Sequence, residues 1–134
     1  MTMPIILDAS TVIAVVTNEA HKPALVRMTR GAELLSPASL TAEIGNAFSA
    51  MFKRKRLSLE EAQAAVAELW RIPIRQVPID ITHALELSHS LRIYAYDAYL
   101  IACGLQYHAP LLTLDGGLRD AARQAGVTVP EIQA

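Results

Sequence analysis

Two acidic residues, Asp8 and Asp115, each follow a short run of apolar residues. The runs cover residues 4–7 and 110–114, and continuous apolar runs of this length indicate strands that are buried on both faces. Open α/β sheets place their ligand sites beyond the carboxyl ends of such strands, where carboxylates could bind a hard divalent cation. The alternative role for each acid is to cap a following helix. At the first strand, Ser10 could cap that helix about as well as Asp8.

Two further acids, Glu43 and Asp97, fall within predicted helices. Glu43 borders an apolar stripe, and considered alone it is better explained as a surface acid that the helix dipole favours near an N-terminus. Asp97 stands at the head of a stripe that includes Leu100 and Ile101. Its side chain is therefore expected on the core side of its helix, although helix capping is again an alternative. The residue types alone leave capping and chemistry both open.

Alternating strands and helices must position these acids. Apolar or β-branched runs predict strands at residues 4–8, 33–36, 74–77, 110–114 and 127–129. Apolar periodicity and capping signals predict helices at residues 10–17, 22–30, 38–56, from 58 onward, 80–91, 97–107 and 118–124. Asp115-Gly116-Gly117 would ordinarily indicate a hairpin turn, but the helical residues that follow weaken that interpretation. The pattern predicts one domain over residues 1–134, an α/β/α sandwich with a mainly parallel central sheet and a protruding helical hairpin.

Composition favours a cytoplasmic protein that has a protein partner. Of the 134 residues, 52% are hydrophobic, and the mean hydropathy is +0.28. This exceeds what one small core easily buries. The longest apolar stretch, residues 4–16, is interrupted by Asp8 and lacks preceding basic residues, so it fits neither a membrane span nor a signal peptide. The lone Cys103 cannot form an internal disulfide, which also favours the cytoplasm.

Four segments, residues 6–10, 41–46, 96–102 and 112–115, together resemble the PIN-domain ribonucleases. The resemblance is closer still to the VapC toxins of bacterial type II toxin–antitoxin systems, and it spans nearly the whole chain. A strand that ends in aspartate is common, whereas four such motifs in this order are specific. The chain departs from many relatives at Gly116 and Gly117, where polar or charged residues are frequent. The resemblance therefore supplies no additional ligand beside Asp115.

The resemblance implies a metal-dependent endoribonuclease with an acidic catalytic cluster made of Asp8, Glu43, Asp97 and Asp115. Three polar residues would support the cluster: Ser10, Asn46 and Thr113. An all-oxygen site suits Mg²⁺ or Mn²⁺, which lowers the pKa of bound water and orients it for attack on a phosphodiester. The implied partners are an RNA substrate and a VapB-like antitoxin. The implied assemblies are a homodimer and, with antitoxin, a heterotetramer or larger complex.

The predicted hairpin carries most of the large apolar residues outside the strands. The sequence predicts that Phe48, Met51, Phe52 and Trp70 pack between its two helices, and the resemblance implies a groove there for the antitoxin's C-terminal segment. The basic residues 53–56 lie at the end of the first helix. They are either a solvated helix C-terminus that the helix dipole favours or a contact for RNA. Without the four acids of the cluster, the chain has 12 basic and nine acidic residues. This surplus of positive charge is compatible with an RNA-binding rim.

Two other functions compete with the ribonuclease. Aspartate-dependent phosphatases also begin with an apolar strand that ends in aspartate, but they need a second aspartate two positions later, where this chain has Ser10. A catalytically silent PIN-like module would bind a partner only. Tyr94, Tyr96 and Tyr99 surround Asp97 in the sequence, and two of them are as well explained by packing in the core as by stacking on RNA bases.

Overall fold

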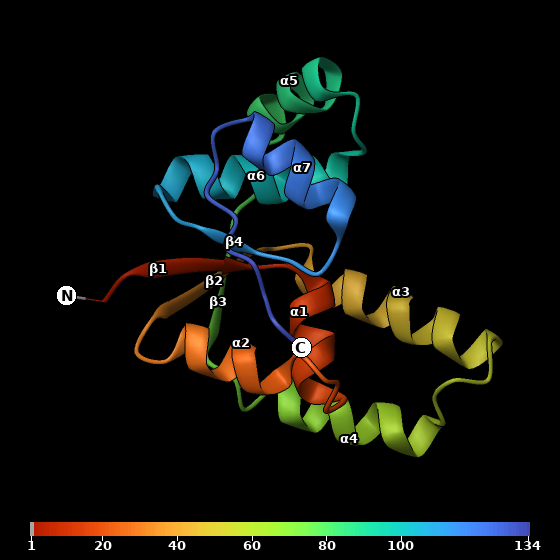
Figure 1. The fold of residues 1–134 in the computed structure, drawn as a ribbon. Helices are drawn as coiled ribbons and strands as arrows, with labels where there is room; N and C mark the ends of the chain where they lie inside the picture. The colour runs from red at the N-terminus through yellow and green to blue at the C-terminus, as the bar shows by residue number, and fades with distance from the viewer. Residues whose placement is uncertain (1) are drawn as a thin grey trace.

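Four short strands lie side by side at the centre of the molecule and form one parallel sheet (Figure 1). The structure is a computed structural model that describes residues 2–134. The strands are β1 (Pro4–Leu7), β2 (Glu33–Pro37), β3 (Ile74–Val77) and β4 (Leu111–Leu112). Their order is β3-β2-β1-β4, and Ile6 of β1 pairs with Leu35 on one side and Leu111 on the other. Strand β1 is therefore central, as its continuous apolar sequence requires.

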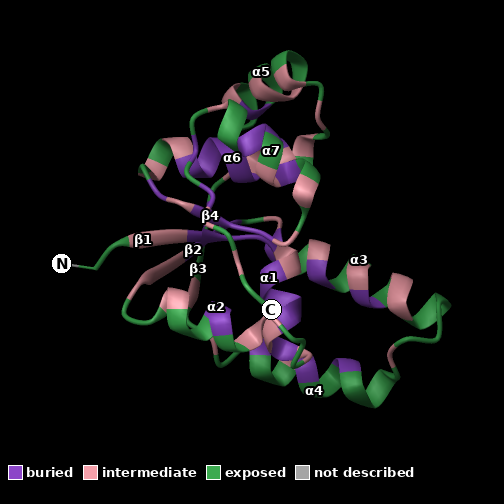
Figure 2. Ribbon diagram, viewed as in Figure 1, coloured by how far each residue is buried: buried purple, intermediate pink, exposed green. Residues whose placement is uncertain are grey.

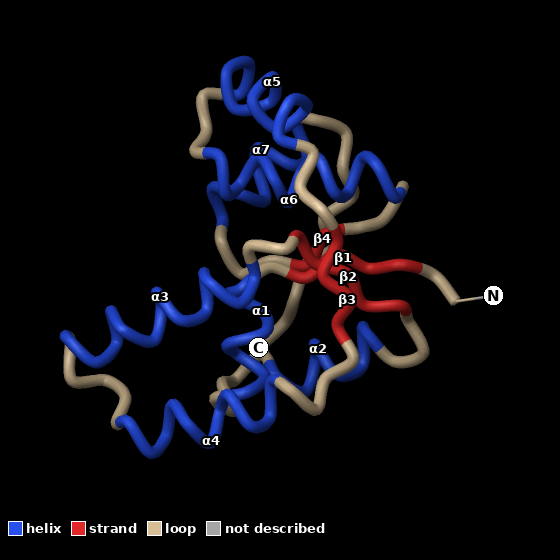
Figure 3. Tube along the Cα trace, turned by 180° about the vertical axis from the view of Figure 1, so that it is seen from behind, coloured by secondary structure: helices blue, strands red, loops and turns tan. Residues whose placement is uncertain are grey.

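Helices cover both faces of the sheet. In residues 2–134 they are α1 (Ala9–Val16), α2 (Lys22–Thr29), α3 (Leu40–Lys53), α4 (Leu59–Leu69), α5 (Ile81–Leu91), α6 (Ala95–Tyr107) and α7 (Gly116–Gln124). Helices α5, α6 and α7 lie on one side of the sheet, and α1 and α2 lie on the other (Figure 1). Helices α3 and α4 extend away from this second layer (Figure 3). The predicted three-layer α/β/α fold with a protruding hairpin is confirmed.

The central strand contributes to a separate hydrophobic core on each face of the sheet. Ile6 belongs to the core beneath α6 and α7, whereas the next residue, Leu7, belongs to the core beneath α1. Buried residues accordingly concentrate in the strands and on the inner faces of α1, α6 and α7 (Figure 2). Because both faces are covered, every position of this short strand favours an apolar side chain.

The α3–α4 hairpin is anchored on α1. Ser58 and Glu61 form a reciprocal capping box at the start of α4. Phe48 is buried, but Phe52 is 38% exposed and Trp70 is 64% exposed. The prediction that these two residues pack inside the hairpin is wrong, because α3 and α4 both contact α1 and their outer faces remain in solvent.

Two local predictions also differ from the structure. Helix α6 begins at Ala95, ahead of Asp97, because Tyr94 supplies the extended backbone that precedes the first turn. Residues 127–129 do not form a strand and make one hydrogen bond beside β4, from the Leu111 N–H to the Thr128 carbonyl (2.9 Å). Pro130 has no N–H with which to extend that pairing. This segment nevertheless covers the edge of β4. No helix within residues 2–134 has the length and apolar character needed to cross a bilayer.

Candidate active site

Asp8 is buried at the carboxyl end of β1, and three hydrogen-bond donors hold its carboxylate. It caps α1, with Oδ1 accepting from the Thr11 backbone N–H at 3.0 Å. The Ser10 hydroxyl lies 2.7 Å from Oδ1 and 2.9 Å from Oδ2, and the Thr113 hydroxyl donates to Oδ2. Capping and a place in the site are therefore compatible, and the carboxylate of Asp8 has one fixed orientation.

Hydroxyl groups join the ends of β1 and β4. Leu7 pairs with Leu112, so Asp8 and Thr113 leave adjacent strands side by side. The Ser10 hydroxyl accepts from the Leu114 N–H, and the Thr113 hydroxyl accepts from the Asp115 N–H, each at 3.0 Å. Two of the three residues predicted to support the acids, Ser10 and Thr113, therefore contact Asp8 directly and also fix the backbone that carries Asp115.

Asp115 caps α7 at the opposite side of this junction. Its Oδ1 accepts from the Gly117 N–H at 2.9 Å and from the Leu118 N–H at 3.1 Å. The side chain is otherwise exposed. Because α7 begins at Gly116, the glycine pair forms the first turn of a helix and not a hairpin turn.

Glu43 lies in the first turns of α3 and is held by a residue that the sequence analysis did not identify. The Ser39 hydroxyl donates to Oε2 of Glu43 at 2.7 Å. Ser39 occupies the N-cap position of α3 but makes no capping hydrogen bond with its side chain. Its spacing of four residues from Glu43 was the available signal, because such residues share a helix face. Within residues 2–134, no side-chain hydrogen bond joins Asn46 to Glu43, although both line one surface depression.

Asp97 lies in the first turn of α6 and is half-buried. Burial raises its pKa, and the negative charges of Asp115 and Asp8 raise that pKa further. In the described part of the chain, no hydrogen bond restrains its carboxylate. Of the four acids, Asp97 is therefore the one that is freest to reorient.

The same electrostatic coupling links the remaining acids. Burial raises the pKa of Glu43 despite the opposing hydrogen bond from Ser39, and the charges of Asp8 and Asp97 raise it further. Burial also raises the pKa of Asp8, against the lowering effect of its hydrogen bonds. None of the ion pairs found in residues 2–134 includes any of the four acids. The structure thus brings four carboxylates from four elements into one electrostatic cluster, and no basic side chain of residues 2–134 forms an ion pair with it.

The donor chemistry of this cluster fits a hard divalent cation. All of its donors are carboxylate or hydroxyl oxygens, which suit Mg²⁺ and Mn²⁺. Even so, no three His, Cys, Asp or Glu side chains in the described residues are arranged as a ready-made metal site. Asp8, Glu43 and Asp115 each accept a hydrogen bond from a hydroxyl or N–H donor on or beside their own element. The like charges of the carboxylates also repel one another. The acids are therefore neighbours but do not form a closed ligand set.

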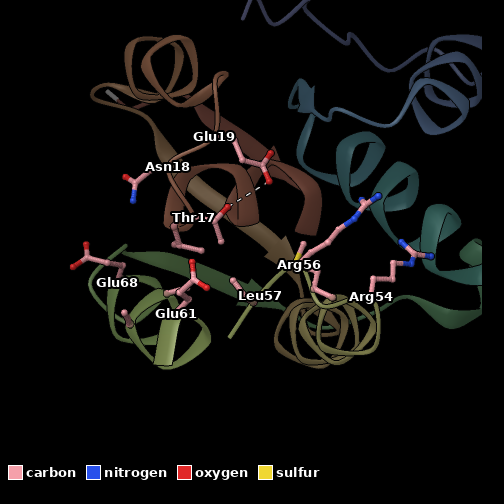
Figure 4. A pocket seen from close by; sticks show the side chains of 12 residues that line it. Thr17, Asn18, Glu19, Arg54, Arg56, Leu57, Glu61 and Glu68 are labelled. Atoms are coloured by element: carbon pink, nitrogen blue, oxygen red, sulfur yellow. Dashed lines mark hydrogen bonds between the residues drawn. The ribbon is translucent and has the colours of Figure 1, made fainter. Parts of the chain in front are cut away.

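Two hollows lie near the α3–α4 hairpin, and one of them adjoins the acids. A depression of about 280 Å³ borders Glu43 and is lined by Ala9, Ala42, Asn46, Ala47 and Tyr96. A larger hollow of about 540 Å³ lies away from the acids, between the end of α1, the end of α3, and α4 (Figure 4). Its size does not make it the catalytic site, because it contains none of the four clustered acids.

Known proteins are similar to this chain in sequence or in fold. Ribonuclease VapC12 of Mycobacterium tuberculosis is 27% identical over 118 residues, which cover 85% of this chain and 88% of that protein. The crystal structure of VapBC2 from Rickettsia felis, bound to a DNA fragment from its promoter, matches with a TM-score of 0.71 and 12% identity. That match covers 98% of this chain and 100% of the other chain.

The crystal structure of Mycobacterium tuberculosis VapC20, described as a sarcin-ricin loop cleaving toxin, has a TM-score of 0.63 and 15% identity. It covers 87% of this chain and 94% of that chain. At these identities the structural matches establish the fold. The sequence match to the PIN domain extends over residues 5–124, which is most of the chain. The chain belongs to the PIN-domain family and is distantly homologous to the VapC ribonuclease toxins.

Proposed function

We propose that this protein is a Mg²⁺- or Mn²⁺-dependent endoribonuclease that acts as the toxin of a toxin–antitoxin pair. The observation that carries the proposal is the cluster of four acids: Asp8 and Asp115 follow β1 and β4, and Glu43 and Asp97 lie in α3 and α6. Burial raises the pKa values of Asp8, Glu43 and Asp97. Distant homology to the VapC ribonucleases supports RNA as the substrate. The RNA substrate and the lone Cys103 favour the cytoplasm.

The four acids would hold the metal, and they differ in how firmly hydrogen bonds hold their carboxylates. A bound cation would supply an activated water and would stabilise charge on the phosphate oxygens. Asp8 provides a rigid carboxylate, because Ser10 and Thr113 restrain both of its oxygens. Glu43 keeps Oε1 available while Ser39 binds Oε2, and Asp115 keeps Oδ2 available. The Asp97 carboxylate can rotate toward the other acids, because no hydrogen bond within residues 2–134 restrains it.

Purified protein tests the proposed activity directly. Wild type should cleave single-stranded RNA in Mg²⁺ or Mn²⁺ and should lose this activity in EDTA. Asp97→Asn should lose it in any metal, whereas Asp120→Asn should retain it, because Asp120 is exposed and pairs with Arg119 on the surface. Cleavage that persists in EDTA would overturn the proposal. Calorimetry without detectable metal binding would favour a silent binding module.

The antitoxin is proposed to occupy the hollow in Figure 4. Its floor includes Val16 and Leu57, and its rim carries basic Arg54 and Arg56 on one side and acidic Glu61 and Glu68 on the other (Figure 4). An apolar floor with charges of both signs around it suits an amphipathic peptide segment. The hollow adjoins the hairpin without overlapping the four acids.

Filling this hollow tests the antitoxin proposal. Ala64 lines the hollow, whereas Ala67 is exposed on the same helix and does not line it. Ala64→Trp should retain RNA cleavage but resist inhibition by a small protein that co-purifies with wild type from source cells. Ala67→Trp should remain inhibited. Equal inhibition of both variants would place the antitoxin elsewhere.

Helix α5 is the proposed homodimer surface. Ile81 is 50% exposed and Leu85 is 54% exposed, and their spacing puts them on one face of the helix. Leu85→Glu should shift the sedimentation velocity of a dimer to that of a monomer, whereas Ser90→Glu, on the opposite face, should not. A Leu85→Glu variant that remains dimeric would exclude this surface.

A further inference from the structure

The three tyrosines around Asp97 have different environments in the structure. Tyr99 packs against the small core between α5 and α6, beside Ala84, Ala98 and Ala102. Tyr94 is 87% exposed and precedes α6. Tyr96 is 56% exposed and lines the depression that also contains Glu43. Only Tyr96 therefore combines a solvent-accessible aromatic ring with a position at the acidic cluster.

Tyr99 supports the ring of Tyr96. The two ring centroids are 5.8 Å apart and the ring planes are at 89°, an edge-to-face contact. Edge-to-face packing is one of the preferred arrangements of aromatic pairs. Because Tyr99 is itself held in a core, the contact restricts the motion of Tyr96. A ring that is already ordered loses less conformational entropy when it binds a ligand.

The depression beside Tyr96 is suited to a flat group. Three of its lining residues are alanines, at positions 9, 42 and 47, so its floor is small-chained and apolar. Asn46 is exposed at the same place, and its side-chain amide can both donate and accept hydrogen bonds. An aromatic wall, a small apolar floor and one amide are the features that bind an unpaired nucleobase.

We infer that Tyr96 is a positioning residue that stacks on the base adjacent to the cleaved phosphodiester and thereby directs the enzyme to unpaired RNA. This inference rests on the proposed ribonuclease function. Asp97 follows Tyr96 in the chain, and Glu43 shares its depression, so a base held on this ring brings its own backbone phosphate toward the acids. A base within a duplex is stacked on its neighbours and cannot reach the ring.

Binding measured without cleavage tests this inference separately from the proposed function. A short fluorescein-labelled single-stranded RNA of mixed sequence is titrated in EDTA and followed by fluorescence anisotropy. Tyr96→Leu should weaken binding roughly 5- to 150-fold, the range expected for losing one base–aromatic stack. Tyr96→Phe should bind within about twofold of wild type, because its ring is retained. Tyr94→Leu is the matched control and should bind like wild type.

An abasic scan identifies the stacked base with wild-type protein. Removing one base at a time should weaken wild-type binding most at a single position. At that position the abasic RNA should bind Tyr96→Leu and wild type equally, because the stacking partner is already missing. In Mg²⁺, Tyr96→Leu should raise KM for unpaired RNA with little change in kcat, as expected for lost ground-state binding.

The outcomes separate the two proposals. If wild type cleaves RNA and Tyr96→Leu matches it in both binding and KM, the stacking inference is wrong while the ribonuclease function stands. If RNA binds through Tyr96 but metal supports no cleavage, the ribonuclease function is wrong and the stacking site remains. If Tyr96→Leu binds RNA normally but escapes inhibition by the antitoxin, the depression serves the protein partner, and the inference is overturned.

Discussion

The hydroxyl of Thr113 donates a hydrogen bond to the carboxylate of Asp8, although the two residues are 105 positions apart in the chain. The contact follows from the pairing of β1 with β4, which brings the carboxyl ends of the two strands together. The same hydroxyl accepts from the Asp115 backbone N–H at 3.0 Å. One side chain thus connects two of the four acids.

Replacing Thr113 by valine should destabilise the protein and impair cleavage. The substitution keeps the shape of the side chain but removes one hydrogen bond from the buried Asp8 carboxylate and leaves the Asp115 N–H without its partner. The expected loss is about 1–3 kcal/mol in the free energy of unfolding, measured by urea titration. Thr113→Ser keeps the hydroxyl and should retain most of the stability and activity. Equal losses for the two variants would mean that the methyl group, and not the hydrogen bonds, is responsible.

Ser39→Ala should reduce metal affinity and activity without a comparable loss of stability. The Ser39 hydroxyl orients Glu43 and caps no backbone group of α3 with its side chain. Loss of a residue that orients a metal-binding carboxylate typically costs roughly 10- to 100-fold in affinity or activity. Calorimetric titration with Mn²⁺ measures the affinity, and thermal unfolding measures the stability. Ser49→Ala on the same helix is the control. The role assigned to Ser39 fails if both variants bind Mn²⁺ equally.

Asp97→Asn should stabilise the metal-free protein at neutral pH. The folded-state pKa values of Asp8, Glu43 and Asp97 are raised, so the folded protein binds protons more tightly than the unfolded chain. Their contribution to stability is therefore complete below the ordinary pKa of about 4 and is lost as pH rises through the raised values. Removing Asp97 also relieves repulsion on Glu43, a partly screened effect of a few tenths to about 1 kcal/mol.

The measurement is urea unfolding in EDTA across a pH series, with Asp120→Asn as the control. The increase in the free energy of unfolding caused by Asp97→Asn should become smaller toward low pH, where the clustered carboxylates of wild type are protonated. Adding Mn²⁺ should then stabilise wild type and leave Asp97→Asn nearly unchanged, because only a folded site binds the cation. A gain that is independent of pH would show that charge repulsion is not its cause.

Cys103 should react very slowly with thiol reagents in the folded protein. Burial raises the pKa of its thiol to about 11, although the positive charge of Arg75 opposes part of this effect. The side chain is also 5% exposed, so both protonation and access disfavour reaction. Labelling with a maleimide should be slow in buffer near neutral pH and rapid in urea. Because Cys103 is the sole cysteine of the chain, the rate reports one site. Rapid labelling of the folded protein would indicate that α6 opens locally.

The sequence predicted the elements because the features that define them are local. The apolar run of β1, the capping box at Ser58 and Glu61, and the glycine stop after α2 each depend on neighbouring residues. Boundaries were less well predicted where a tertiary contact replaces regular pairing, as beside β4, or where a cap carries no sequence signal, as at Tyr94. Exposure of Trp70 was missed because apolar periodicity does not specify which neighbour a helix packs against.

The sequence alone determined which acids follow strands and which lie near the starts of helices, because strand ends and helix starts are encoded within a few residues. The family pattern, and not local physics, was needed to associate Glu43 with the other acids. Tertiary structure decided which hydroxyl restrains which carboxylate, through strand pairing between Asp8 and Thr113 and through helix geometry between Ser39 and Glu43. It also decided that Tyr99 packs while Tyr96 faces the site, because side-chain burial depends on neighbours that only the folded chain supplies.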